Sequence, residues 1–150
     1  MLQETNKAPD FKLPDAKGKS IRLKNFKGQN VVLYFYPKDL TPGCTTQACD
    51  FSANLNQFKK KGALVIGVSL DDEARHQKFI EKYGLKHILL SDVDQKVSKA
   101  YGVYQQKSLY GKKFMGIVRS TFVIDKEGKI KKIFPKVKVA GHWKEVLEAI

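Results

Sequence analysis

Two continuous apolar runs stand out in the first half of the chain, NVVLYFYP at residues 30–37 and ALVIGVSL at 63–70. Runs of β-branched and aromatic residues of this length are typical of strands buried on both faces of a sheet. A shorter run, HILLSD, follows at 87–92, and STFVID (120–125) and KIKKIF (129–134) flank a Lys-Glu-Gly turn. With helices between the first strands, this order predicts an α/β sandwich with a partly parallel sheet.

The segments between these strands carry helix and hairpin signals. A helix is expected from Pro42, and capping residues and apolar periodicity predict three more, at 71–84, 94–102 and 140–150. FKLPDAKGKSIRL (11–23) predicts two short strands around a Lys-Gly turn, which places a β-hairpin near the N-terminus. YQQKSLYGKKFMGIV (104–118) is expected to form a loop because of its Gly and Lys content. Residues 1–150 are expected to fold as a single domain with a central mixed sheet flanked by helices.

The helix predicted from Pro42, with Thr41 as its cap, carries both cysteines of the chain. Its apolar stripe consists of residues within about 40° of a common line, which are Cys44, Ala48, Phe51, Leu55 and Phe58. Cys44 is therefore expected to face inward, and Cys49, about 140° around the helix, outward or sideways. In an ideal helix their Cα atoms lie about 8.7 Å apart, which exceeds the limit of about 7 Å for a disulfide. A bond between the two thiols would require the first turns to unwind.

Composition and charge restrict the cellular setting. The chain has 42% hydrophobic residues and lacks a basic-then-apolar leader or an apolar run long enough to cross a bilayer, so a cytoplasmic protein without a membrane partner is expected. Two cysteines in a reducing compartment do not indicate a disulfide scaffold. The net charge of +13 comes from 28 basic residues, of which only three are arginine. The lysines are spread along the chain, which favours a solvated surface and no specific nucleic-acid site.

A thiol in the first turn of a helix is a candidate nucleophile, because free N–H groups and the helix dipole favour the thiolate. An ordinary thiol is about 3% ionised at pH 7, so complete ionisation adds at most about 30-fold in reactivity. Other groups must stabilise the transition state, and for attack on an O–O bond these are donors aimed at the peroxide oxygens. Thr41, three residues before Cys44, and Arg119, just before a buried strand, are the candidates.

The segment PKDLTPGC at residues 37–44 resembles the Pro-x-x-x-Thr/Ser-x-x-Cys signature of the peroxiredoxins. The C-x-x-x-x-C spacing resembles the bacterioferritin comigratory protein branch, also called PrxQ, and the similarity runs along nearly the whole chain. This resemblance implies a thioredoxin-like fold and a thiol peroxidase without a metal or organic cofactor. It further implies that Cys44 is the peroxidatic nucleophile and Cys49 the resolving thiol, that Thr41 and Arg119 activate the site, and that Pro37 shields the pocket.

One position departs from that signature, because Gln47 stands where the family usually has glutamate. A neutral amide can still accept a hydrogen bond from an arginine. The implied cycle oxidises Cys44 with hydrogen peroxide or an organic hydroperoxide, joins it to Cys49 in a disulfide, and regenerates both thiols with thioredoxin or a similar dithiol. The resemblance also implies a monomer.

Without the motif, the same residues have structural explanations. Cys44 would be a small buried hydrophobe, Cys49 an inert flank residue, Thr41 a helix cap and Arg119 a surface charge. Two alternative functions remain. A thioredoxin-like disulfide reductase would share the fold but normally carries C-x-x-C, and a binding protein for nucleic acid or acidic partners would explain the charge.

Overall fold

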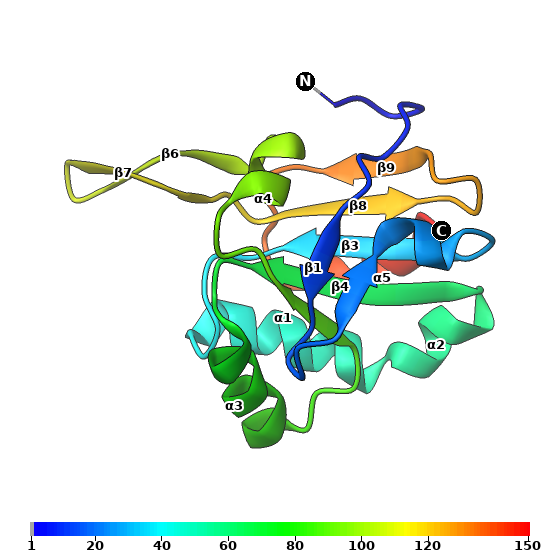
Figure 1. Ribbon diagram of the computed structural model, residues 1–150, viewed down its shortest axis with the longest axis horizontal. Coiled ribbons are helices and arrows are strands. Elements are labelled where there is room, and N and C mark those ends of the chain that lie inside the picture. Colours follow the sequence, from blue (N-terminus) through cyan, green and yellow to red (C-terminus); the bar gives the residue numbers. More distant parts are fainter. Residues whose placement is uncertain (1) are drawn as a thin grey trace.

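A five-stranded mixed sheet forms the centre of the computed structural model, which describes residues 2–150 (Figure 1). Its strands lie in the order β5 (Ile88–Ser91), β4 (Ala63–Ser69), β3 (Asn30–Phe35), β8 (Ser120–Ile124) and β9 (Ile130–Phe134). β3, β4 and β5 are parallel, β8 is antiparallel to β3, and β9 is antiparallel to β8. The mixed α/β fold predicted from the apolar runs is confirmed.

The central strand β3 has apolar side chains on both faces, which explains why its sequence shows no alternation with polar residues. Val31, Leu33 and Phe35 belong to one buried cluster, and Val32 and Tyr34 belong to a second cluster on the opposite face. The N-terminal segment and Tyr101 complete the first cluster, whereas residues of the long helices complete the second. The sheet therefore separates two apolar layers.

The predicted helices are present at the expected places. They are α1 (Pro42–Ala53), α2 (Leu55–Lys60), α3 (Glu73–Tyr83), α4 (Lys96–Ala100) and α5 (His142–Glu148), with a short 3₁₀ turn, η1 (Leu23–Phe26). The predicted stripe from Cys44 to Phe58 is buried, but it lies on two helices, because the helix is interrupted at Asn54. None of the helices described for residues 2–150 is long and apolar enough to cross a membrane.

Two hairpins accompany the sheet. β1 (Lys12–Pro14) and β2 (Ser20–Arg22) form the predicted N-terminal hairpin. The loop expected at 104–118 is wrong: β6 (Tyr104–Leu109) and β7 (Lys112–Ile117) form an antiparallel hairpin that extends away from the sheet (Figure 1). Its two turn residues, Tyr110 and Gly111, both have positive φ, which matches the twist of a tight hairpin turn. Most of its side chains are exposed, so the strands lack the apolar alternation that identifies a strand in a sequence.

Candidate active site

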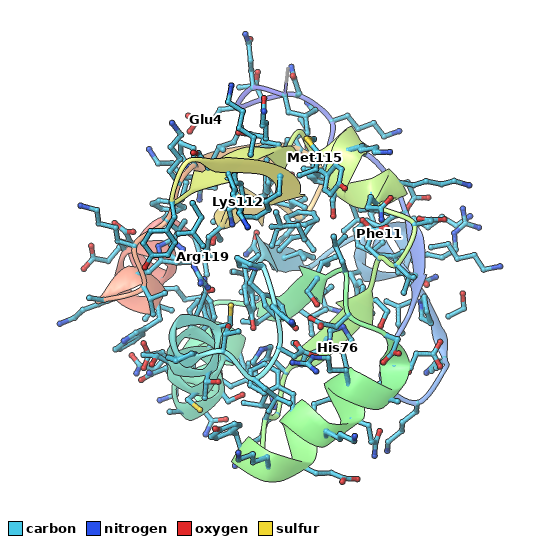
Figure 2. All side chains as sticks on the ribbon, turned by 90° about the vertical axis from the view of Figure 1, so that its left-hand side faces the viewer. Glu4, Phe11, His76, Lys112, Met115 and Arg119 are labelled. Atoms are coloured by element: carbon cyan, nitrogen blue, oxygen red, sulfur yellow. The ribbon has the colours of Figure 1, made fainter. Side chains whose placement is uncertain are left out.

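The topology brings the start of α1 and the start of β8 to the same end of the sheet. β3 runs into residues 36–41, here called the thiol loop, which lead directly into α1. Because β8 is antiparallel to β3, its first residue, Ser120, pairs with the last residue of β3, Phe35. Arg119 therefore lies beside the helix that carries both cysteines. Figure 2 shows Arg119 between the β6–β7 hairpin and α1.

Arg119 makes the central contact of this region. Its Nη2 donates to the Sγ of Cys44 at 3.3 Å, and its Nη1 donates to the Oε1 of Gln47 at 2.5 Å. Cys44 and Gln47 are both buried and lie one helical turn apart, so one planar guanidinium reaches both. A Cβ atom on Gly43 would lie 3.3 Å from Nη2, so the glycine leaves room for the arginine.

The amide of Gln47 has a second polar atom in this region, its nitrogen. Its oxygen is occupied by Arg119, but among residues 2–150 its buried Nε2 has no hydrogen-bond partner. A buried N–H group without a partner is unfavourable unless a ligand or water supplies an acceptor. The amide can therefore orient the arginine through its oxygen and offer a donor through its nitrogen.

Thr41 is the N-cap residue of α1, but its side chain does not cap the helix. Its hydroxyl donates to the carbonyl of Lys38 at 2.7 Å instead of accepting a bond from the first helical turn. It makes no hydrogen bond to Cys44 in the described part of the chain. The hydroxyl hydrogen is thus committed to the loop backbone, and the oxygen remains available as an acceptor for a ligand. Pro37 lies half-buried in the same loop.

Cys49 lies on the flank of α1, as predicted, and is half-buried. Burial, and secondarily the charge of Asp50, raise the pKa of its thiol. Both cysteines are free thiols within one intact helix. An open groove of about 510 Å³ adjoins Cys49 and is lined in part by Lys59, Tyr83 and Lys86.

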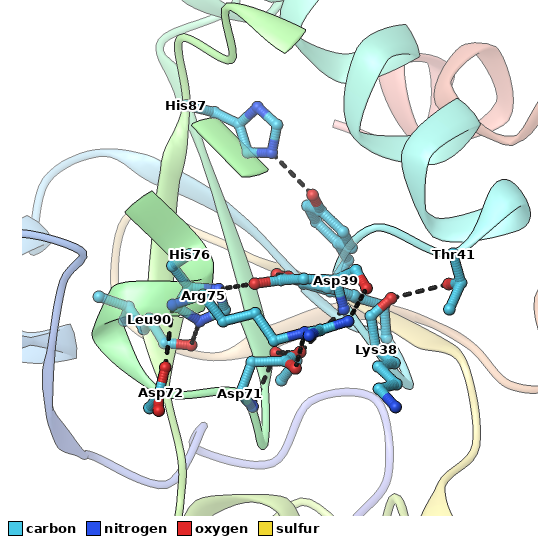
Figure 3. Close-up of polar contacts among 12 residues, drawn as sticks. Lys38, Asp39, Thr41, Asp71, Asp72, Arg75, His76, His87 and Leu90 are labelled. Atoms are coloured by element: carbon cyan, nitrogen blue, oxygen red, sulfur yellow. Dashed lines mark hydrogen bonds and ion pairs between the residues drawn. The ribbon is translucent and has the colours of Figure 1, made fainter. Parts of the chain in front are cut away.

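Polar residues with no predicted role lie behind this site in a buried network. His76 Nδ1 contacts Asp39 Oδ2 at 2.5 Å (Figure 3). Burial alone would lower the pKa of His76, but the hydrogen bond and charge of Asp39 outweigh burial and raise it. Asp39 lies inside the thiol loop, yet its partner is 37 residues away in sequence. No periodicity or spacing indicates such a pair.

A second buried histidine contacts the last turn of α1. His87 bonds to the Tyr34 hydroxyl at 2.7 Å and to the Ser52 hydroxyl at 2.7 Å. Burial lowers the pKa of His87 to about 3, so this ring is neutral. The apolar surroundings of HILLSD were visible in the sequence, but the two hydroxyl partners were not.

A buried thiol at a helix start, held by an arginine that directly precedes a strand of a mixed sheet, defines a thiol-dependent oxidoreductase of the thioredoxin fold. Residues 5–133 match the AhpC/TSA family. The chain is 51% identical over 143 residues to a putative peroxiredoxin, Bcp, of Helicobacter pylori, covering 95% of this chain and 94% of that protein. Peroxiredoxin Bcp of Bacillus subtilis is 48% identical over 144 residues, covering 96% and 92%.

Solved structures agree with these relatives. The bacterioferritin comigratory protein of Xanthomonas campestris has a TM-score of 0.88 and 43% identity, covering 93% of this chain and 88% of that one. A mutant of Xylella fastidiosa PrxQ has a TM-score of 0.89 and 36% identity, covering 97% and 95%. The chain therefore belongs to the AhpC/TSA family, in the bacterioferritin comigratory protein or PrxQ branch of the peroxiredoxins, and it is a thiol peroxidase.

Proposed function

We propose that this peroxidase reduces hydrogen peroxide and organic hydroperoxides with Cys44 as the peroxidatic nucleophile. The contact between Arg119 and the Cys44 sulfur, at 3.3 Å, carries the proposal, because it puts a permanent cation beside a buried thiol. The Xanthomonas campestris relative has been described with alkyl peroxide reduction activity, which supports this substrate class.

In the first step the Cys44 thiolate attacks one oxygen of the hydroperoxide. A sulfur–oxygen bond forms, the O–O bond breaks, and sulfur supplies the two electrons. The departing oxygen takes a proton and leaves as water or an alcohol, and Cys44 becomes a sulfenic acid. Arg119 and the free Nε2 of Gln47 donate toward the negative charge that develops on oxygen, while Thr41 accepts the hydroperoxide O–H. Pro37 shields the pocket from water.

In the second step the Cys49 thiol attacks the sulfenic acid, so that a disulfide forms and water leaves. In an ideal helix their Cα atoms lie about 8.7 Å apart, too far for this bond. The start of α1 must therefore unwind. Its N-cap side chain makes no bond to the helix and its first positions are Pro42 and Gly43, so the opening is less costly than in a capped helix.

In the third step a thioredoxin-type dithiol reduces the disulfide and is itself oxidised. The half-buried Cys49, beside its groove, is the sulfur that such a protein reaches first. The net charge of +13 would accelerate the encounter with an acidic protein partner. No step needs a residue of a second chain, so the protein is proposed to act as a monomer in a reducing compartment such as the cytoplasm.

Mass spectrometry after one equivalent of hydrogen peroxide tests this cycle. The expected product has lost two hydrogens and yields a peptide with Cys44 and Cys49 bridged. Cys44→Ser should abolish peroxide turnover, and Cys49→Ser should react once and then stall at the sulfenic acid. Equal turnover by Cys44→Ser and the parent protein would rule out the proposed nucleophile. A normal catalytic rate in Cys49→Ser would rule out the resolving role alone.

A further inference from the structure

One peptide unit in the thiol loop is held from both sides. The N–H of Asp39 donates to Asp71 Oδ2 at 2.8 Å, and the carbonyl of Lys38, on the same peptide, accepts from the Thr41 hydroxyl at 2.7 Å (Figure 3). Because a peptide is planar, fixing the direction of the N–H also fixes the direction of the carbonyl. The carboxylate of Asp71 thereby determines where the hydroxyl of Thr41 points.

The carboxylate of Asp71 is itself fixed in place. Its Oδ2 also accepts from the Ser69 hydroxyl at 2.6 Å, and its Oδ1 lies 3.1 Å from Arg75 Nε. The same guanidinium of Arg75 also donates through Nη2 to the carbonyl of Asp39 at 3.2 Å. The end of β4 and the first turn of α3 therefore hold the backbone on both sides of Asp39.

The side chain of Asp39 adds a third attachment. It is fully buried and accepts from the Tyr36 hydroxyl at 2.6 Å and from His76 Nδ1 at 2.5 Å. His76 Nε2 faces the carbonyl of Leu90 at 2.9 Å, which can only accept, so this nitrogen carries a hydrogen. The ring is thus fixed between β5 and the thiol loop.

The next residue shows that these attachments hold the loop in an unusual shape. Leu40 has a φ of +64°, in the left-handed region, which is unfavourable for a leucine by about 1–2 kcal/mol. Such a conformation persists only where its surroundings impose it. Here Asp39 is fixed on one side of Leu40, and on the other the Thr41 hydroxyl is bonded back to Lys38.

We propose that Asp71 and His76 are positioning residues of the peroxidase reaction, which act on the substrate through the Lys38–Asp39 peptide and the Thr41 hydroxyl. With its hydrogen committed to Lys38, Thr41 presents only acceptor lone pairs to the pocket. A hydroperoxide then donates to Thr41 and accepts from Arg119, which orients its O–O bond toward the sulfur. This inference rests on the proposed role of Cys44.

Two adjacent carboxylates provide a matched pair of variants. Asp71→Asn changes the acceptor of the Asp39 N–H. Asp72→Asn removes the same charge one residue away, from the N-cap residue of α3, whose side chain accepts from the backbone N–H of Arg75 at 2.9 Å. Reduced protein is mixed with hydrogen peroxide or with iodoacetamide, and the rate of Cys44 modification is measured for each. Iodoacetamide needs a nucleophilic sulfur but no oriented O–O bond.

Asp71→Asn should slow the reaction with peroxide about 10-fold or more, because a small displacement of an orienting group has a large effect on rate. Its iodoacetamide rate should stay within about 2-fold, and Asp72→Asn should leave both rates within about 2-fold. On a Thr41→Val background, Asp71→Asn should add nothing, since coupled residues are not additive. His76→Gln, which retains an N–H donor, should lose less peroxide reactivity than His76→Leu.

An equal loss toward both reagents, or the same factor with and without the Thr41 hydroxyl, would overturn the positioning role while leaving Cys44 as nucleophile. Failure of the parent protein to react with peroxide at Cys44 would instead overturn the proposed function, and this inference with it. Hydrogen exchange gives a readout that needs no peroxide: the Asp39 amide should lose protection in Asp71→Asn but keep it in Asp72→Asn. Unchanged protection in Asp71→Asn would also contradict the proposal.

Discussion

The two sides of the segment that carries both thiols are held by different chemistry. Before α1, the thiol loop is held by a charged anchor, in which Asp39 contacts His76. Within α1, Ser52 is held by a neutral anchor, in which His87 also binds the hydroxyl of Tyr34. The pKa of His76 is raised and that of His87 is lowered to about 3, although both rings are buried. The Asp39 carboxylate outweighs the effect of burial on the pKa of His76, whereas the two hydroxyls beside His87 leave the effect of burial in place.

This difference bears on the proposed resolution step. The residues between the anchors, 40–51, include both cysteines and the uncapped start of α1. If unwinding stays between the anchors, residues 36–39 and the last two residues of α1, Ser52 and Ala53, keep their places while the disulfide forms. The charged anchor then preserves the geometry for the first step, and the neutral anchor limits how far the helix opens.

The largest expected effect comes from breaking the charged anchor. Asp39→Ala leaves the buried His76 ring and the Tyr36 hydroxyl without their acceptor, which should lower the free energy of unfolding by about 3–5 kcal/mol. Urea unfolding followed by circular dichroism measures this change. Asp94→Ala, which removes a largely exposed carboxylate, is the control and should change it by less than about 0.5 kcal/mol. Similar losses for the two variants would show that the charged anchor is not special.

Acid should weaken the neutral anchor next. The unfolded chain protonates His87 near pH 6.5, but the folded chain does so only near 3, so stability falls as the pH drops between these values. The difference in unfolding free energy between the parent and His87→Gln should shrink by about 2 kcal/mol from pH 6.5 to 5. Urea titrations at both values measure it.

For the charged anchor, the change of stability with pH is expected to have the opposite sign. Because the pKa of His76 is raised on folding, its protonation stabilises the folded chain fully below the unfolded value, and this contribution is lost as pH rises through the folded value. The difference between the parent and His76→Gln should therefore be largest at low pH. The same direction for both histidines would remove the distinction between the anchors.

A smaller effect is expected from the neutral anchor itself. Ser52→Ala removes the acceptor of the Lys86 N–H at 3.0 Å and the partner of His87, and should lower the unfolding free energy by about 1–2 kcal/mol. Thr46, whose hydroxyl donates to the carbonyl of Pro42 at 3.1 Å within the same helix, is the control, and Thr46→Ala should change the unfolding free energy by less than about 0.5 kcal/mol.

In the disulfide form, hydrogen exchange should extend beyond residue 51 only in Ser52→Ala. The same extent in the parent would show that the neutral anchor does not limit unwinding.

The sequence indicated the thiol and its arginine but not the residues that hold them. The apolar runs and helix caps identify the strands and helices that carry the thiol and the arginine, because burial and capping leave local patterns in the sequence. The proximity of Cys44 and Arg119, 75 residues apart, was suggested by the place of Arg119 just before a buried strand and by the resemblance to the family. The anchors join residues that are distant in sequence and have no periodicity, so no local pattern indicates them. Thr41 was predicted as a cap, yet its hydroxyl bonds to Lys38 because the thiol loop folds back on itself.

The β6–β7 hairpin gives the smallest expected effect and a baseline for the comparison. It lies near the site, since burial and the charge of Arg119 lower the pKa of Lys107, but Tyr110 in its turn is 97% exposed. Tyr110 has a φ of +51°, where asparagine is better tolerated, so Tyr110→Asn should raise the unfolding free energy by about 0.5 kcal/mol or less. The peroxide rate should not change, as stopped-flow measurement can check. A marked loss of peroxide reactivity would mean that proximity to Arg119, and not attachment to an anchor, determines which residues the reaction depends on.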